Sequence, residues 1–196
     1  EIPTNVPLQR LRNNYNGELF HSESDISFRN DYWNITEFGR ANFPNSSKFY
    51  ASLASKYIDE IRVTNVLETN KVFRENKAIR KRQIFTSGEW ATESNLNVAI
   101  FPFNTNAILY NDEIRFHAET FESILINYSE AEKKVHKKML KFVSNFYSIK
   151  NIRSHYDYSF TAFLSELLFD KYKFDGILYP SVRANYKTYN IVMQPD

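Results

Sequence analysis

Hydrophobic residues fall into short runs towards both ends of the chain, separated by polar stretches. Residues 48–52 alternate between apolar and polar positions, which is typical of a half-buried strand. We expect strands at 6–12 and 48–52, two more flanking a polar turn at 83–90 and 96–103, and two closing strands at 176–179 and 190–193. The stretch 13–45 is broken by Gly17, Gly39 and Pro44, so it predicts mostly loop.

Apolar positions at helical spacing dominate the middle of the chain. A stripe that begins after Ser55 predicts one helix, and residues 111–125 and 158–172 predict two more. Ser129 and Glu132 have the spacing of a capping box at the start of a long helix. One face of that helix is apolar, with lysines mostly opposite, and consists of Val135, Met139, Phe142, Val143 and Phe146.

Strands at both ends with helices between them predict an α+β fold, a small mixed β-sheet flanked by helices. The length of 196 residues fits a single domain over 1–196, and the 42% hydrophobic content supplies material for its core. The chain opens at Glu1 without an initiator Met, so it is compatible with a fragment that lacks an N-terminal region. It contains no apolar run of membrane-spanning length and no signal peptide, and we expect a cytoplasmic protein that does not bind membranes.

Several kinds of chemistry are excluded or disfavoured. The chain has no Cys, so disulfides, thiolate metal sites and Cys nucleophiles are ruled out. None of the four His lies in a His-Glu-x-x-His frame, and we expect no metal site. Phosphate-binding glycine loops and the Gly-x-Ser-x-Gly turn are absent as well. A net charge of +2 gives no argument for nucleic-acid binding.

Three stretches stand out, in a fixed order. The first is LQRLR at 8–12, with alternate arginines on a predicted strand. The second is FGRANFP at 38–44, followed by FYAS at 49–52 and by Glu60 in the next helix. The third is FDGILYPSVR at 174–183, closed by NIV at 190–192.

This ordered set resembles the RES domain, a family named for its Arg, Glu and Ser and found in the toxins of bacterial toxin–antitoxin systems. The likeness extends from Arg10 to Val192, with a longer helical region than compact members have. It implies an ADP-ribosyltransferase-like fold and NAD as the substrate, with no separate cofactor. Members of the family break the nicotinamide–ribose bond by hydrolysis or with phosphate as co-substrate, and some transfer ADP-ribose to proteins.

The resemblance also assigns roles to residues of this chain. The implied catalytic residues are Arg10, Glu60 and Ser181, with Arg12 as a rival for the role of Arg10. The implied NAD-binding residues are Arg12, Arg40, Asn42, Tyr50 and Arg183. The family further implies an antitoxin that restrains the enzyme, and a regulatory domain of the same chain is the alternative.

The residue types suit this chemistry. Arginine binds a pyrophosphate in a bidentate manner. Nicotinamide leaves as a neutral molecule, so one carboxylate suffices to stabilise the positive charge that develops on the ribose. Tyr50 could stack on nicotinamide, and Ser181 could hydrogen-bond its amide or the ribose.

Each residue also has an ordinary structural explanation. Strand arginines such as Arg10 and Arg12 are usually solvated, Glu60 lies in a charged helix surface, and Tyr50 beside Phe49 suits a core. The basic stretches at 71–82 and 133–141 leave open a module that binds phosphate groups without catalysis, although nearby glutamates dilute their charge. A relative that kept the fold and lost its activity is a third alternative.

Overall fold

The computed structural model describes residues 1–53, 58–74 and 82–195, and for 58–60, 71 and 74 it describes the backbone alone. Its centre is a six-stranded mixed sheet in the order β3-β1-β2-β6-β5-β4. All neighbouring strands are antiparallel except β4 and β5. The strands are β1 (Pro7–Asn13), β2 (Phe49–Leu53), β3 (Phe85–Ala91), β4 (Val98–Ile100), β5 (Gly176–Pro180) and β6 (Tyr189–Met193). The expected α+β class with a mixed sheet and flanking helices is confirmed.

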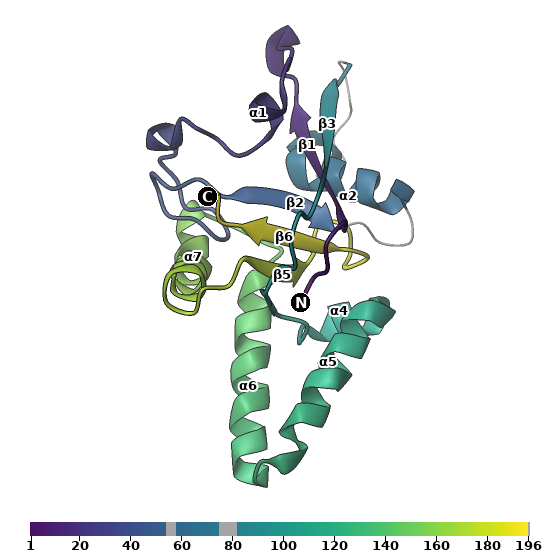
Figure 1. Cartoon of the computed structure of the whole chain (residues 1–196), viewed down its shortest axis with the longest axis vertical. Coiled ribbons are helices and arrows are strands. Elements are labelled where there is room, and N and C mark those ends of the chain that lie inside the picture. The colour runs from purple at the N-terminus through teal and green to yellow at the C-terminus, as the bar shows by residue number, and fades with distance from the viewer. Residues whose placement is uncertain (54–57, 75–81, 196) are drawn as a thin grey trace.

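Helices and short turns of helix flank this sheet, and the long helices near the middle of the chain extend below it (Figure 1). The helices are α1 (Glu23–Ile26), α2 (Ile58–Thr69), α3 (Lys71–Arg74), α4 (Thr105–Tyr110), α5 (Asp112–Ile124), α6 (Glu130–Tyr147) and α7 (Ser159–Glu166). Shorter 3₁₀ turns cover Tyr15–Gly17, Tyr32–Asn34, Leu125–Asn127 and His155–Tyr158, and a π-helical turn covers Leu167–Lys171. Among the described residues, no helix is both long and apolar enough to cross a bilayer.

Most expected elements are confirmed, and two differ. The predicted strand at 96–103 is reduced to Val98–Ile100, because Phe101 bonds to β5 but the chain then turns towards α4. The predicted helix at 158–172 changes after Glu166 into the wider π-helical turn, which delivers the chain to β5. The start of the helix expected from Ser55 lies outside the described residues, as do positions 75–81 of the basic stretch.

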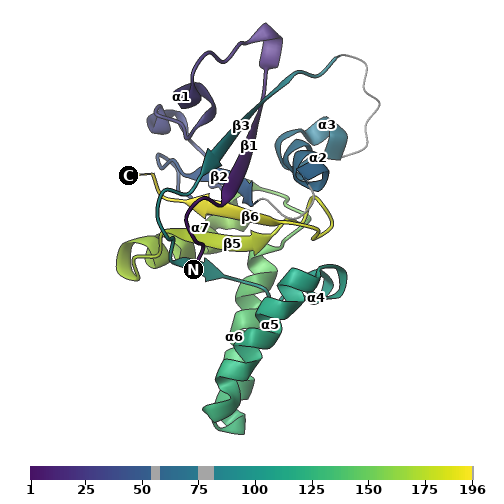
Figure 2. The same cartoon turned by 45° about the vertical axis from the view of Figure 1, so that its right-hand side comes forward.

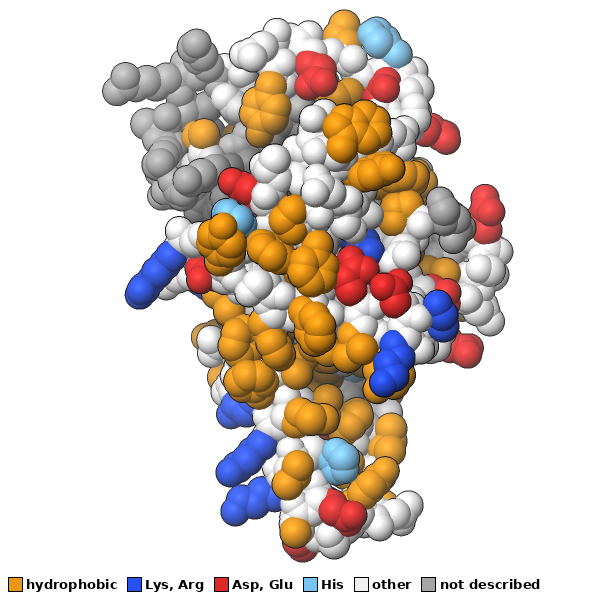
Figure 3. Space-filling model, turned by 90° about the vertical axis from the view of Figure 1, so that its left-hand side faces the viewer, with side chains coloured by type: hydrophobic (Ala, Val, Ile, Leu, Met, Phe, Trp, Pro, Cys, Tyr) orange, Lys and Arg blue, Asp and Glu red, His pale blue; other side chains and the backbone are white. Residues whose placement is uncertain are grey.

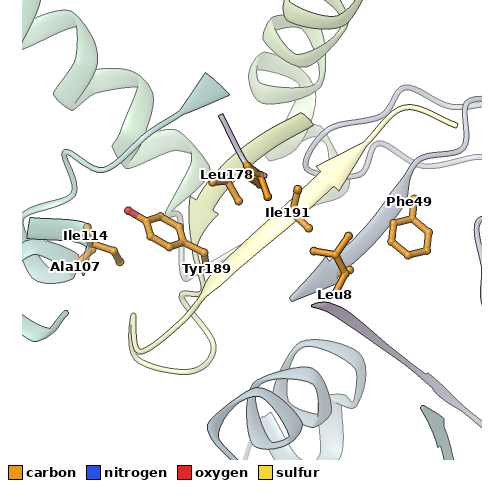
Figure 4. Packing of buried hydrophobic residues seen from close by; sticks show 9 residues of the cluster. Leu8, Phe49, Ala107, Ile114, Leu178, Tyr189 and Ile191 are labelled. Atoms are coloured by element: carbon orange, nitrogen blue, oxygen red, sulfur yellow. The ribbon is translucent and has the colours of Figure 1, made fainter. Parts of the chain in front are cut away.

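The apolar core lies on the central strands β5 and β6 (Figure 4). Ile177 of β5 and both Ile191 and Val192 of β6 are fully buried, because these strands are covered on both faces. One cluster joins Ile191 and Leu178 to Ile114 of α5, and a second surrounds Tyr147 at the end of α6.

Shortening Ile191 to Val should lower the free energy of unfolding by about 0.5–1.5 kcal/mol, since a buried methylene is lost and a small cavity is left. The matched control is Ile124→Val, because Ile124 is 59% exposed. Urea unfolding followed by circular dichroism measures both. Equal stability of the two variants would show that Ile191 does not have the packing described.

The strands β1 and β2 separate along most of their length. β1 pairs with β3 at every residue from Pro7 to Asn13, but it pairs with β2 only at Leu8 and Gln9. Beyond Gln9 the β1–β3 ribbon therefore diverges from β2, as Figure 2 shows. The result is an opening in the sheet, and its walls are the outer half of β1 and the start of β2.

The helix α2 covers this opening from one face of the sheet. Its inward positions are Ile61, Thr64, Asn65 and Glu68, which recur at helical spacing. Asn65 contacts both strands, since its amide donates to Gln9 and its carbonyl oxygen accepts from Ser52. The side of α2 that faces the sheet is thus mainly polar, which suits the wall of a solvent-filled site better than a core.

Candidate active site

A cavity of about 390 Å³ occupies the opening between β1 and β2. Its described walls combine arginines, tyrosines and amide or hydroxyl side chains with one carboxylate. They are Arg10, Leu11, Arg12, Arg40, Tyr50, Ala51, Ser52, Asn65, Glu68, Thr69, Tyr158, Tyr179, Arg183 and Asn190. Four guanidinium groups thus face a single carboxylate among the described lining residues, and this balance favours an anionic ligand.

Arg10 bridges the gap between the separated strands. Its Nη1 donates to the backbone oxygen of Tyr50 at 2.7 Å, and its guanidinium lies 5.3 Å from the ring centre of Phe49. Burial, and to a smaller extent Arg12, lowers the pKa of Arg10 to about 10, so the side chain remains charged at neutral pH. Its Nε is buried and has no hydrogen-bond partner among the described residues. A buried charged donor without a partner is costly, and an anion in the cavity would supply one.

Arg12 lies further out on the same strand. Its Nη1 donates to the backbone oxygen of Asp25 at 2.8 Å, and its guanidinium lies 5.9 Å from the ring centre of Phe20. Partial burial, followed by the charge of Arg29, lowers the pKa of Arg12. The alternation along β1 therefore places two cationic groups on one side of the opening.

Arg40 is held by the end of α6, far away in the sequence. Its Nη1 donates to the backbone oxygen of Tyr147, and its Nη2 donates to that of Ile149 at 3.5 Å. The guanidinium also lies 5.1 Å from the ring centre of Tyr158 and 5.4 Å from that of Tyr179. Carbonyl oxygens and aromatic faces are both favourable partners for a cation, so they fix the orientation of Arg40.

Tyr50 positions the turn that carries Arg40. Its hydroxyl accepts a hydrogen bond from the backbone N–H of Ala41 at 3.0 Å and donates to Oδ1 of Asn42 at 2.8 Å. Burial raises the pKa of Tyr50 well above its usual value, so the hydroxyl keeps its proton. Gly39 leaves room for this bond, because a Cβ there would lie 2.2 Å from Oδ1 of Asn42 and would displace its side chain.

Removing this hydroxyl should loosen the turn. In Tyr50→Phe, the N–H of Ala41 and Oδ1 of Asn42 lose their partner inside the protein, which should lower the free energy of unfolding by about 1–3 kcal/mol. Chemical unfolding measures the loss. Tyr110→Phe is the control, since Tyr110 is 70% exposed. Equal stability of Tyr50→Phe and wild type would show that the Tyr50 hydroxyl does not hold this turn in place.

The acidic residue of the cavity is Glu68, near the end of α2. Its Oε1 accepts hydrogen bonds from Oγ of Ser181 at 2.7 Å and from Nδ2 of Asn190 at 2.9 Å. Ser181 is fully buried just after β5, and Asn190 lies on β6. Two donors on one oxygen fix the orientation of the carboxylate.

The structure thus brings together most of the residues expected from the sequence, but not all. Arg10, Arg12, Arg40, Tyr50 and Arg183 line the cavity, and Ser181 lies behind Glu68. Asn42 is not among the lining residues, since its amide is bonded to Tyr50 and to the backbone oxygen of Phe43.

Glu60 lies in the first turn of α2, and its side chain lies outside the described residues. Glu68 comes eight residues later on the same helix, about 12 Å further along the axis. Sequence reasoning missed Glu68. The available signal was the spacing of Ile61, Thr64, Asn65 and Glu68, which places all four on one face of the helix.

Within the described residues, no group of three or more His, Asp or Glu side chains is placed to hold a metal ion. Comparisons of the chain with protein-family models, with curated proteins and with solved structures found no match.

Proposed function

We propose that this chain is an enzyme that consumes NAD by cleaving the bond between nicotinamide and ribose. The observation that carries the proposal is the cavity at the split in the sheet, where four arginines face one carboxylate oriented by Ser181 and Asn190. NAD combines the two features that such a cavity would recognise, an anionic pyrophosphate and a ribose that becomes positively charged during cleavage.

The arginines would bind the pyrophosphate. Arg10 has a buried donor with no partner in the described part of the chain, and Arg40 is held in place from outside the cavity by carbonyl oxygens. Both are thus oriented before a ligand arrives, which lowers the entropic cost of binding. Tyr158 and Tyr179 offer aromatic surface next to Arg40 for a flat ring such as nicotinamide.

Glu68 would act on the ribose. As the bond from C1′ of the ribose to the ring nitrogen breaks, its electron pair leaves with nicotinamide, and positive charge develops on the sugar. The nearby carboxylate stabilises this charge. Water then bonds to C1′ and loses a proton to solvent or to Glu68, giving ADP-ribose. With phosphate as the nucleophile the product is ADP-ribose 1″-phosphate, and with a protein side chain it is an ADP-ribosylated protein.

This assignment gives Ser181 a role different from the one expected from the sequence. Its hydroxyl donates to Glu68 at 2.7 Å, so it positions the carboxylate. We also propose that Glu68, rather than Glu60, corresponds to the glutamate of the RES family. The resemblance to that family and to ADP-ribosyltransferases supports the proposal. We extend the proposal to a cytoplasmic enzyme that an antitoxin or a regulatory domain restrains.

Expression in bacterial cells tests this proposal. The full chain should lower cellular NAD and stop growth, and Glu68→Gln should do neither at equal expression. Incubation of the chain with a cell extract and biotin-labelled NAD distinguishes a protein acceptor from water or phosphate, because only transfer to protein leaves a labelled band on a gel. Normal growth and normal NAD in cells that contain abundant folded, unbound protein would contradict the proposal.

A further inference from the structure

The helix α6 has a second apolar face, which the described part of the chain leaves exposed. Its inward side is buried through Ser144 and Tyr147. Val135, Met139 and Phe142 lie on another side and are 63%, 56% and 53% exposed. They recur at the spacing i, i+4 and i+7, so they form one stripe along about two turns.

This stripe continues onto α7. The ring centres of Phe142 and Phe146 lie 4.8 Å apart, and those of Phe146 and Phe160 lie 4.7 Å apart. Phe163, one turn further along, is 60% exposed. We call Val135, Met139, Phe142, Phe146, Phe160 and Phe163 the apolar ridge. Figure 3 shows hydrophobic side chains gathered along the lower part of the molecule, with Lys and Arg side chains along one edge.

The ridge ends at a hollow. A depression of about 410 Å³ lies beside Phe146 and Phe160. Half of its wall is apolar or aromatic, and the other half is polar, formed by Asn151, Arg153, Asp157 and Ser159. Its size would accommodate a large apolar side chain of a bound molecule. A linear stripe that leads to a hollow is the usual geometry for binding an amphipathic helix by anchors three or four residues apart.

The charge beside the ridge is positive. Lys133 pairs with Glu130, and Lys137 pairs with Glu122 of α5. Lys134, Lys138 and Lys141, on the side of α6 next to the stripe, are exposed and form no ion pair with any described residue. Their spacing of four and three residues makes a second line parallel to the stripe.

We propose that the apolar ridge is a docking site for an acidic amphipathic helix of a partner protein. Apolar side chains of that helix would cover the ridge and fill the hollow, and its carboxylates would face the three lysines. A second copy of this chain fits less well, since packing ridge against ridge would bring two rows of lysines together.

The ridge is connected to the candidate active site. Phe146 and Ile149, at the end of α6, line the hollow. In the same segment, the backbone oxygens of Tyr147 and Ile149 accept hydrogen bonds from Arg40. A helix bound at the hollow would therefore act on the segment that orients Arg40. This regulatory consequence rests on the proposed function, whereas the docking itself does not.

Binding can be tested with a synthetic 21-residue helical peptide that carries Leu and Phe on one face and Glu beside them. Fluorescence anisotropy should show binding to the full chain that weakens with salt. Met139→Glu and Phe142→Ser should each weaken it by about tenfold or more, as loss of a central anchor does. Phe116→Ser is the control, because Phe116 is 64% exposed on α5. Circular dichroism confirms that each variant is folded.

Two outcomes would overturn the docking proposal. One is equal affinity for the peptide in which every Glu is replaced by Lys. The other is binding of the chain to vesicles of phosphatidylglycerol that depends on Met139 and Phe142 while the acidic peptide does not bind. Hydrogen exchange tests the connection to Arg40 without any assay of activity. Bound peptide should slow exchange at 146–150, and unchanged exchange there would contradict the connection.

Discussion

Replacing Glu68 with glutamine should lower the rate of nicotinamide release from NAD by about a hundredfold or more. The amide has nearly the same shape as the carboxylate, but it cannot stabilise the charge that develops on the ribose. Ser181 and Asn190 can still donate to the remaining carbonyl oxygen, so the fold should be retained. Initial rates measured by chromatography, together with thermal unfolding of the same samples, separate loss of catalysis from loss of structure.

The matched control is Glu60→Gln. It makes the same chemical change eight residues earlier on α2, outside the described walls of the cavity. We expect it to release nicotinamide at close to the wild-type rate. The reverse result, an inactive Glu60→Gln and an active Glu68→Gln, would return the catalytic role to Glu60 and contradict the assignment made from the cavity.

Replacing Arg10 with lysine should raise the Michaelis constant for NAD by about 10- to 100-fold, with a smaller effect on kcat. Lysine keeps the charge of arginine. It lacks the planar fork and the Nε donor, which is buried and has no partner among the residues that the structure describes. One or two hydrogen bonds to the pyrophosphate are therefore lost, and each bond to a charged group contributes about 1.5–3 kcal/mol.

Steady-state kinetics over a range of NAD concentrations measures this effect. Arg62→Lys is the control, because Arg62 lies on the exposed side of α2. An unchanged Michaelis constant in Arg10→Lys would show that Arg10 does not bind the substrate. An equal loss of kcat and kcat/KM would place its interaction in the transition state instead.

Periodicity predicted the elements of this fold but not the way in which the sheet opens. The strand at 6–12 and the closing strands near the C-terminus have strong local signals, and they form as expected. The order of the strands could not be predicted, since β1 pairs with both β2 and β3 across long loops. The separation of β1 from β2 depends on which of these pairings is continuous, and no local pattern encodes that choice.

The candidate site could be predicted only in part, because it too depends on contacts between segments that are distant in sequence. Arg10 and Arg40 were found through local motifs, but the partners that hold them are distant in sequence, as the bonds of Arg40 to the end of α6 show. Glu68 was missed because a glutamate on a helix is usually solvated. Glu68 differs from Glu60 in the sequence only because it shares a helix face with Ile61 and Asn65. That this face lines a cavity depends on where the sheet opens, which the sequence of the helix does not encode.

Proton NMR of NAD mixed with the purified chain tests directly whether the cavity between β1 and β2 cleaves the nicotinamide–ribose bond of NAD, as we propose. We expect free nicotinamide to appear as NAD disappears, with ADP-ribose in plain buffer or ADP-ribose 1″-phosphate in phosphate buffer. The same amount of folded Glu68→Gln should leave NAD intact. Unchanged NAD after prolonged incubation with the wild-type chain in both buffers and in the presence of a protein acceptor, with protein shown to be folded and unbound, would contradict the proposed cleavage.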